Sequence, residues 1–192
     1  MNDSLPQDSA RLPDEAATGL TAVTVGLGWN GADAPAPDWD LDLSALLCDE
    51  SGKVLSDRHF VFYNNLRSPD GSVWHTGDSI NGGDGGGDDE QILVCLSTVP
   101  AEVARIVFPV SIHEAEKREQ CFGQVRDAFV RVTNQEDRRE VARCNLSEDA
   151  SAQTAVLFGE VYRDGPEWKF RALGREYASG LFGIAKDFGV NL

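Results

Sequence analysis

The sequence predicts a mainly β fold, an antiparallel β-sandwich of about nine strands with two short helices, one of them C-terminal. Short runs rich in β-branched and aromatic residues recur along the chain between turn residues, which is typical of strands. A polar residue followed by glycine marks several turns: Ser51-Gly52, Asp70-Gly71 and Asp164-Gly165. Strands do not alternate with helices as a parallel sheet would require.

Nine runs are expected to form strands. They are Leu20–Trp29, Leu41–Cys48, Arg58–Asn64, Ile92–Ser97, Arg105–Ile112, Ala128–Thr133, Glu140–Leu146, Thr154–Tyr162 and Trp168–Leu173. Pro109 interrupts its run, so we expect that strand to lie at an edge or to carry a bulge. Apolar periodicity predicts helices over Glu114–Val125 and Arg175–Phe188, although Gly180 and Gly183 weaken the second.

The length of 192 residues favours one main domain. We expect a β-sandwich over residues 20–192, preceded by a flexible acidic tail over residues 1–19. No apolar run is long enough to cross a membrane, and the first residues do not resemble a secretory signal. The four cysteines show neither CxxC spacing nor a metal-ligand pattern with histidine, which favours a reducing cytoplasm without disulfides.

The net charge of −15 is concentrated in the first half of the chain. Residues 1–104 contain 4 basic and 18 acidic side chains, whereas residues 105–192 contain 13 basic and 14 acidic ones. Nucleic acids and anionic membrane surfaces need a basic face, so both are disfavoured as partners. A cation is the natural partner of the acidic half.

Polar and apolar residues alternate in the stretch Asp40-Leu41-Asp42-Leu43-Ser44-Ala45. On a strand, Asp40, Asp42 and Ser44 would share one face while the alternate residues point into the core. This pattern fits either an ordinary solvated face or two carboxylates that converge on a metal ion.

The segment HTGDSINGGDGGGDDE, residues 75–90, holds six glycines and five acids and no lysine or arginine. Calcium binds 6–8 oxygen ligands, and glycine lets a backbone turn its carbonyls inward. We therefore expect a calcium site whose loop ligands are Asp78, Asn81, Asp84, Asp88, Asp89 and Glu90. The open alternative is a flexible acidic linker. The segment matches neither an EF-hand nor a phosphate-binding P-loop.

The chain resembles the TerD family, the tellurium-resistance and stress-response proteins of bacteria. The resemblance covers about Leu20 to Val190. It rests on several motifs together: GLGW, DLDLSALL, FVFYNN, SPDGSVWHTGD, DDE, LSEDAS, FGEVYR and WKFRALG. One residue is added in the loop, which reads NGGDGGGDDE where TGxGDGDDE is usual in the family.

The resemblance implies a TerD-like β-sandwich that binds calcium between acidic loops and serves in tolerance of tellurite and other stresses. Carried over by position, it adds Asp70 and Gly71 of the PDG turn to the expected metal ligands. His75 is expected to orient the acidic loop, and His59 and His113 to be structural.

Three functional hypotheses remain open. The first, which we favour, is a non-enzymatic calcium-binding stress protein that acts as sensor or scaffold with protein partners. The second is an acidic module that docks basic partners and binds metal incidentally. The third is a metal-dependent hydrolase.

Overall fold

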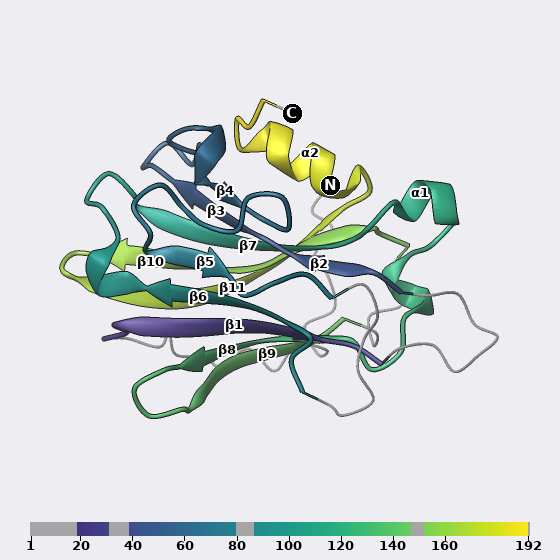
Figure 1. Cartoon of the computed structure of the whole chain (residues 1–192), viewed down its shortest axis with the longest axis horizontal. Helices are drawn as coiled ribbons and strands as arrows, with labels where there is room; N and C mark the ends of the chain where they lie inside the picture. The colour runs from purple at the N-terminus through teal and green to yellow at the C-terminus, as the bar shows by residue number, and fades with distance from the viewer. Residues whose placement is uncertain (1–18, 31–38, 80–86, 147–151, 192) are drawn as a thin grey trace, which may run out of the picture.

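The computed structural model describes residues 19–30, 39–79, 87–146 and 152–191. Its strands form two antiparallel sheets stacked as a sandwich (Figure 1). The expected acidic tail, residues 1–19, lies outside the described residues except for Gly19, as do Asn81 and Asp84.

The first sheet has five strands in the order β5-β6-β1-β8-β9. Their bounds are β1 Ala22–Gly28, β5 Val73–His75, β6 Glu90–Cys95, β8 Phe129–Asn134 and β9 Glu140–Asn145. The central strand β1 pairs with β6 on one side and β8 on the other.

The second sheet has six strands, in the order β11-β10-β7-β3-β4 with β2 also paired to β7. The bounds are β2 Leu41–Leu43, β3 Ala45–Cys48, β4 Phe60–Val61, β7 Arg105–Ile112, β10 Ala155–Asp164 and β11 Glu167–Tyr177. The Asp164-Gly165 turn closes the β10–β11 hairpin as predicted, with Gly165 at φ 61°.

Strand alternation in β7 divides the apolar residues between two cores. Ile106, Phe108 and Val110 point between the sheets, where they join the main core. Val107 faces the other way and packs in a smaller cluster with Ile184 of helix α2, Gly180–Asp187. The six-stranded sheet is therefore covered on both faces, and α2 lies on its outer side (Figure 1).

Two expectations about the strands need correction. The described residues contain eleven strands, since Leu41–Cys48 splits into β2 and β3 and the short β5 was not foreseen. The strand with Pro109 is not at an edge, because β7 lies between β10 and β3. β7 does not carry the bulge either: opposite Pro109 the register of β10 shifts between Leu157 and Gly159, so the extra residue belongs to β10. On the other side of β7, the β2–β3 break falls at Ser44, whose N–H donates to the Pro109 carbonyl at 2.9 Å.

Both helices are shorter than predicted. The first shrinks to α1, Ala115–Arg118, because Glu114 and Glu119 adopt left-handed backbone conformations at its two ends. A separate 3-10 turn follows at Phe122–Gln124. The C-terminal helix starts only at Gly180, because Arg175–Tyr177 extend β11 along β10. Tyr177 still packs in the cluster beneath α2, which explains the helical spacing.

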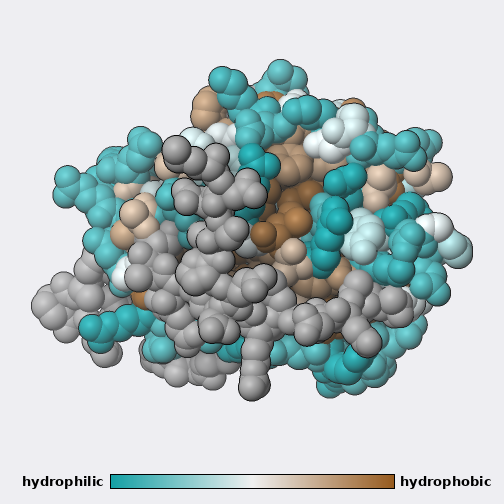
Figure 2. Space-filling model, turned by 180° about the vertical axis from the view of Figure 1, so that it is seen from behind, coloured by the Kyte–Doolittle hydropathy of each residue, from teal (hydrophilic) through white to brown (hydrophobic). Residues whose placement is uncertain are grey.

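No helix among the described residues is long and apolar enough to span a membrane. All four cysteines are free. On the face opposite to that of Figure 1, hydrophobic residues reach the surface in the middle, with hydrophilic residues above and to the right of them (Figure 2).

Candidate metal centre

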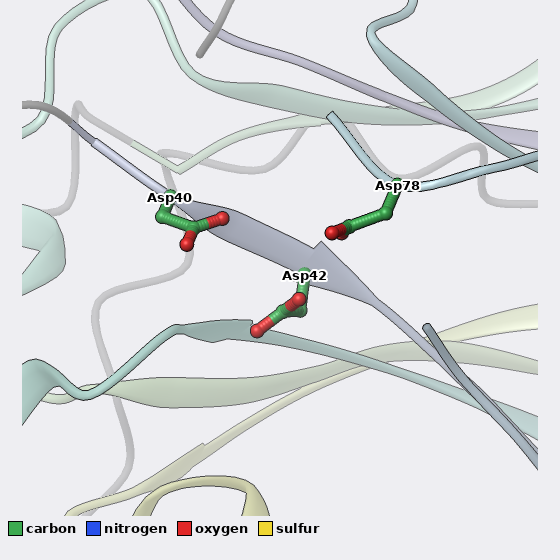
Figure 3. Close-up of side chains that lie close together, drawn as sticks. All are labelled: Asp40, Asp42 and Asp78. Atoms are coloured by element: carbon green, nitrogen blue, oxygen red, sulfur yellow. The ribbon is translucent and has the colours of Figure 1, made fainter. Parts of the chain in front are cut away.

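Three carboxylates from two parts of the chain converge beside the six-stranded sheet. Asp40 and Asp42 lie at β2, and Asp78 lies in the segment after β5 (Figure 3). One oxygen from each of the three lies within 4.8 Å of the others. The sequence placed all three in the expected metal site, and the fold brings them together.

Alternation along β2 positions the two strand carboxylates. Leu41 and Leu43 are buried in the main core between the sheets, so the residues between and before them point to the other face. That face is not solvated, because Asp40 is only 8% exposed and Asp42 only 5%. The alternative of an ordinary solvated strand face is therefore excluded for these two residues.

Glu90 links the strand that carries Asp42 to the segment that carries Asp78. One of its carboxylate oxygens accepts a hydrogen bond from the Leu43 N–H at 2.8 Å, and the other accepts one from the Ser79 N–H at 3.1 Å. His75 Nε2 lies 3.3 Å from the first oxygen, and His75 Nδ1 accepts a hydrogen bond from the Gly77 N–H. Buried Glu90 thus connects Leu43, which follows Asp42, with Ser79, which follows Asp78. His75 contacts Glu90.

Burial and mutual repulsion make the ionised cluster costly. Burial, followed by the charges of Glu90, Asp40 and Asp78, raises the pKa of Asp42 to about 8. Burial is also the main cause that raises the pKa of Asp40 and of Glu90. The charge of His113 lowers the pKa of Asp40 against the effect of burial, and His113 Nδ1 lies 3.5 Å from an oxygen of Asp42. Carboxylates held this close favour either protonation or a bound cation.

The donor set fits calcium. Calcium binds oxygen at about 2.3–2.6 Å, so opposite ligands in its shell stand about 4.6–5.2 Å apart. Three carboxylate oxygens within 4.8 Å of one another can bind one ion of this kind. Magnesium is disfavoured because it keeps several waters and is rarely bound by protein oxygens alone. The donors are all carboxylates, which disfavours transition metals that prefer imidazole or thiolate.

Asp88, Asp89 and Glu90, at the start of β6, do not act together. Alternation turns Asp88 to the outer face of the five-stranded sheet, where it accepts hydrogen bonds from Arg131 Nε at 2.8 Å and from Gln91 at 3.1 Å. It lies over Gly26, where an added Cβ would come within 2.2 Å of its oxygen. Asp89 accepts a hydrogen bond from the Trp29 N–H at 2.9 Å. Neither residue joins the cluster of Asp40, Asp42 and Asp78.

The PDG turn also lies apart from the cluster. Asp70 accepts a hydrogen bond from the Ser72 N–H at 2.8 Å, and Gly71 adopts a positive φ of 77°. Burial alone would raise the pKa of Asp70, but hydrogen bonds from Ser72 outweigh it and lower the pKa. Both residues therefore build a turn. The predicted ligands Asn81 and Asp84 lie outside the described residues.

Sequence reasoning missed His113 as a neighbour of the cluster. It follows β7, and its N–H donates to the Asp40 carbonyl at 2.8 Å. Its position opposite β2 depends on the pairing of Asp42 with Ser111, and nothing in either stretch alone indicates that pairing.

These features define a class of protein: a two-sheet β-sandwich in which two buried aspartates at one short strand and an exposed aspartate of another segment form a carboxylate cluster. The model of the TerD domain matches residues 4–188. The chain belongs to the TerD family.

Similar proteins cover nearly the whole chain. The tellurium resistance protein TerD of Serratia marcescens is 51% identical over 177 residues, which are 92% of this chain and 92% of that protein. General stress protein 16U of Bacillus subtilis is 49% identical and covers 91% of this chain and 90% of its own. A solved structure of a TerD homologue from Streptomyces coelicolor A3(2) is 26% identical, with a TM-score of 0.74 over 87% of this chain and 96% of that one.

Proposed function

We propose that this protein is a calcium-binding stress-response protein of the tellurium-resistance type, which acts by binding and not by catalysis. The observation that best supports calcium is the burial of Asp40 and Asp42 with an oxygen of each within 4.8 Å of an oxygen of Asp78. A divalent cation between them would relieve the repulsion that raises the pKa of Asp42.

Asp40, Asp42 and Asp78 would hold the ion, and Glu90 would fix the distance between the two segments that carry them. Bound calcium would supply the positive charge that orders these carboxylates in one geometry. The ion would therefore couple the segment after β5 to β2, two elements more than thirty residues apart in the sequence.

The names of the relatives, tellurium resistance protein and general stress protein, support a role in stress tolerance. We place this role in the cytoplasm, because the four cysteines are free. A sensor or scaffold that works through protein partners fits a site that would join Asp78, an exposed residue, to two buried aspartates when the ion is bound.

Thermal unfolding of metal-stripped protein tests the calcium site. A ligand that binds only the folded state at a hundredfold excess over Kd adds about 2.7 kcal/mol, which raises the Tm of a protein of this size by about 5–10 °C. We expect this rise with calcium chloride and a smaller one with magnesium chloride. The Asp42→Asn variant should lose most of the rise, whereas Asp70→Asn, in the separate turn, should keep it. An equal Tm with and without calcium would rule out the proposed site.

A further inference from the structure

A second feature lies directly beside the acidic cluster. It is a pocket of about 840 Å³, lined by Asp42, by residues 60 and 62–63, by residues 111–117 and by residues 179–182 at the start of α2. Asp42 is thus part of both the cluster and the pocket wall. The pocket is within the range of about 300–1,000 Å³ typical of sites that take organic groups.

An unbroken series of aromatic rings forms one wall of the pocket. Phe60 and Phe62 stack with centroids 4.4 Å apart, Phe62 meets the edge of Tyr63 at 5.1 Å, and Tyr63 meets His113 at 5.6 Å. At the rim, Phe182 of α2 is 62% exposed, the most exposed large apolar side chain among the described residues.

Carboxylates outnumber ammonium groups in the lining. The carboxylates are those of Glu114 and Glu116, the ammonium group is that of Lys117, and the carboxyl group of Asp42 also lines the pocket. Lys117 Nζ lies 3.0 Å from an oxygen of Glu114, so the one ammonium group of the lining is already paired. Ser111, which is 2% exposed, lines the pocket, and its Oγ has no hydrogen-bond partner among the described residues.

We propose that this pocket receives the side chain of a lysine or arginine presented by a protein partner. Aromatic faces next to carboxylates attract ammonium and guanidinium groups by cation–π and ionic interactions. The volume exceeds that of one side chain, so the neighbouring residues of the partner also find room. The exposed Phe182 gives these residues an apolar contact at the rim.

The position of Asp42 couples this pocket to the metal. Calcium held by Asp40, Asp42 and Asp78 would place a positive ion beside the pocket that receives the basic side chain. Calcium and the basic partner should therefore oppose each other, and each should weaken the other by the same factor. This coupling rests on the proposed calcium site, whereas the pocket itself does not.

Nuclear magnetic resonance tests the pocket without metal. The protein in EDTA is titrated with acetyl-Leu-Arg-Leu-amide, with the citrulline peptide that lacks the charge, and with free arginine amide. We expect saturable amide shifts in residues 60–63, 111–117 and 179–182 with the arginine peptide. The citrulline peptide should bind about fivefold more weakly or worse, because it lacks the positive charge that pairs with the carboxylates of the pocket.

Variants locate the interaction. Glu114→Gln with Glu116→Gln should raise the Kd of the arginine peptide about threefold or more, because two carboxylates are lost. The control Glu102→Gln with Glu167→Gln removes two exposed carboxylates outside this pocket and should leave the Kd unchanged. Phe62→Ala should weaken binding as well, through loss of the ring.

Several results would overturn the proposal. The pocket would not be a site for a basic side chain if the amide shifts do not saturate or occur in other residues. The same conclusion would follow if the citrulline peptide binds as tightly as the arginine peptide. Binding of arginine amide as tightly as the peptide would make a small organic cation, and not a protein, the source. If the arginine peptide binds in EDTA and calcium does not weaken its binding, the pocket is a site for the basic side chain, but it is not coupled to calcium binding.

Discussion

The pH dependence of stability in the absence of metal follows from Asp42. Its pKa is raised from 3.8 to about 8 in the folded protein. Between these values the folded state keeps a proton that the unfolded state has lost, so the free energy of unfolding falls as the pH rises. The slope is about 1.4 kcal/mol for each pH unit, so Asp42 alone removes about 4 kcal/mol between pH 5 and pH 8. That is a large part of the 5–15 kcal/mol typical of a folded domain.

Urea unfolding in EDTA at pH 5, 6, 7 and 8 measures this effect. The Asp42→Asn variant lacks the ionisable group, so its curve against pH should be flatter than that of the wild type. At pH 8 the metal-free variant should be the more stable of the two, although it should gain no stability from calcium. Asp137→Asn, at an exposed position, is the matched control and should keep the wild-type slope. Parallel curves for the wild type and Asp42→Asn would refute the reasoning.

Two further substitutions test the hydrogen bonds of Glu90 and the close packing between β10 and β11. Glu90→Gln places an amide donor against the N–H of Leu43 or Ser79, so it should lower the free energy of unfolding in urea by about 1–3 kcal/mol. It should also weaken calcium binding. Unchanged calcium affinity would show that the contacts of Glu90 are not needed for the site. Gly159→Ala would put a Cβ 2.6 Å from the Phe170 ring, so we expect a loss of about 1–3 kcal/mol in the same assay. Gly87→Ala, where a Cβ meets nothing within 4 Å, is its control, and similar losses for both would argue against the close packing.

Local patterns predicted the elements whose residues specify them directly. The alternation around Asp42 placed Leu41 and Leu43 in the core, and the Gly165 turn predicted the β10–β11 hairpin. The TerD resemblance identified the family before the fold was known. The predicted C-terminal helix was too long because the apolar residues that follow the helical spacing belong partly to the end of β11 and partly to α2.

Long-range pairing could not be read from local patterns. The contact of Glu90 with the Leu43 N–H joins residues 47 positions apart, and the contact of Asp88 with Arg131 joins residues 43 positions apart. Both depend on strand register, which the neighbouring residues do not fix. For this reason the sequence treated Asp88, Asp89 and Glu90 as one group of ligands, whereas alternation gives them three different partners.

The most direct test of the central claim is calorimetric titration of folded, metal-stripped protein with calcium chloride. The account predicts saturable heat for the wild type and for Asp70→Asn, and a large loss of affinity for Asp78→Asn. Asp78 is exposed at its own position, so this substitution removes a ligand with little effect on folding. Heat no greater than dilution for the wild type, or wild-type affinity in Asp78→Asn, would contradict the claim that Asp40, Asp42 and Asp78 hold a calcium ion.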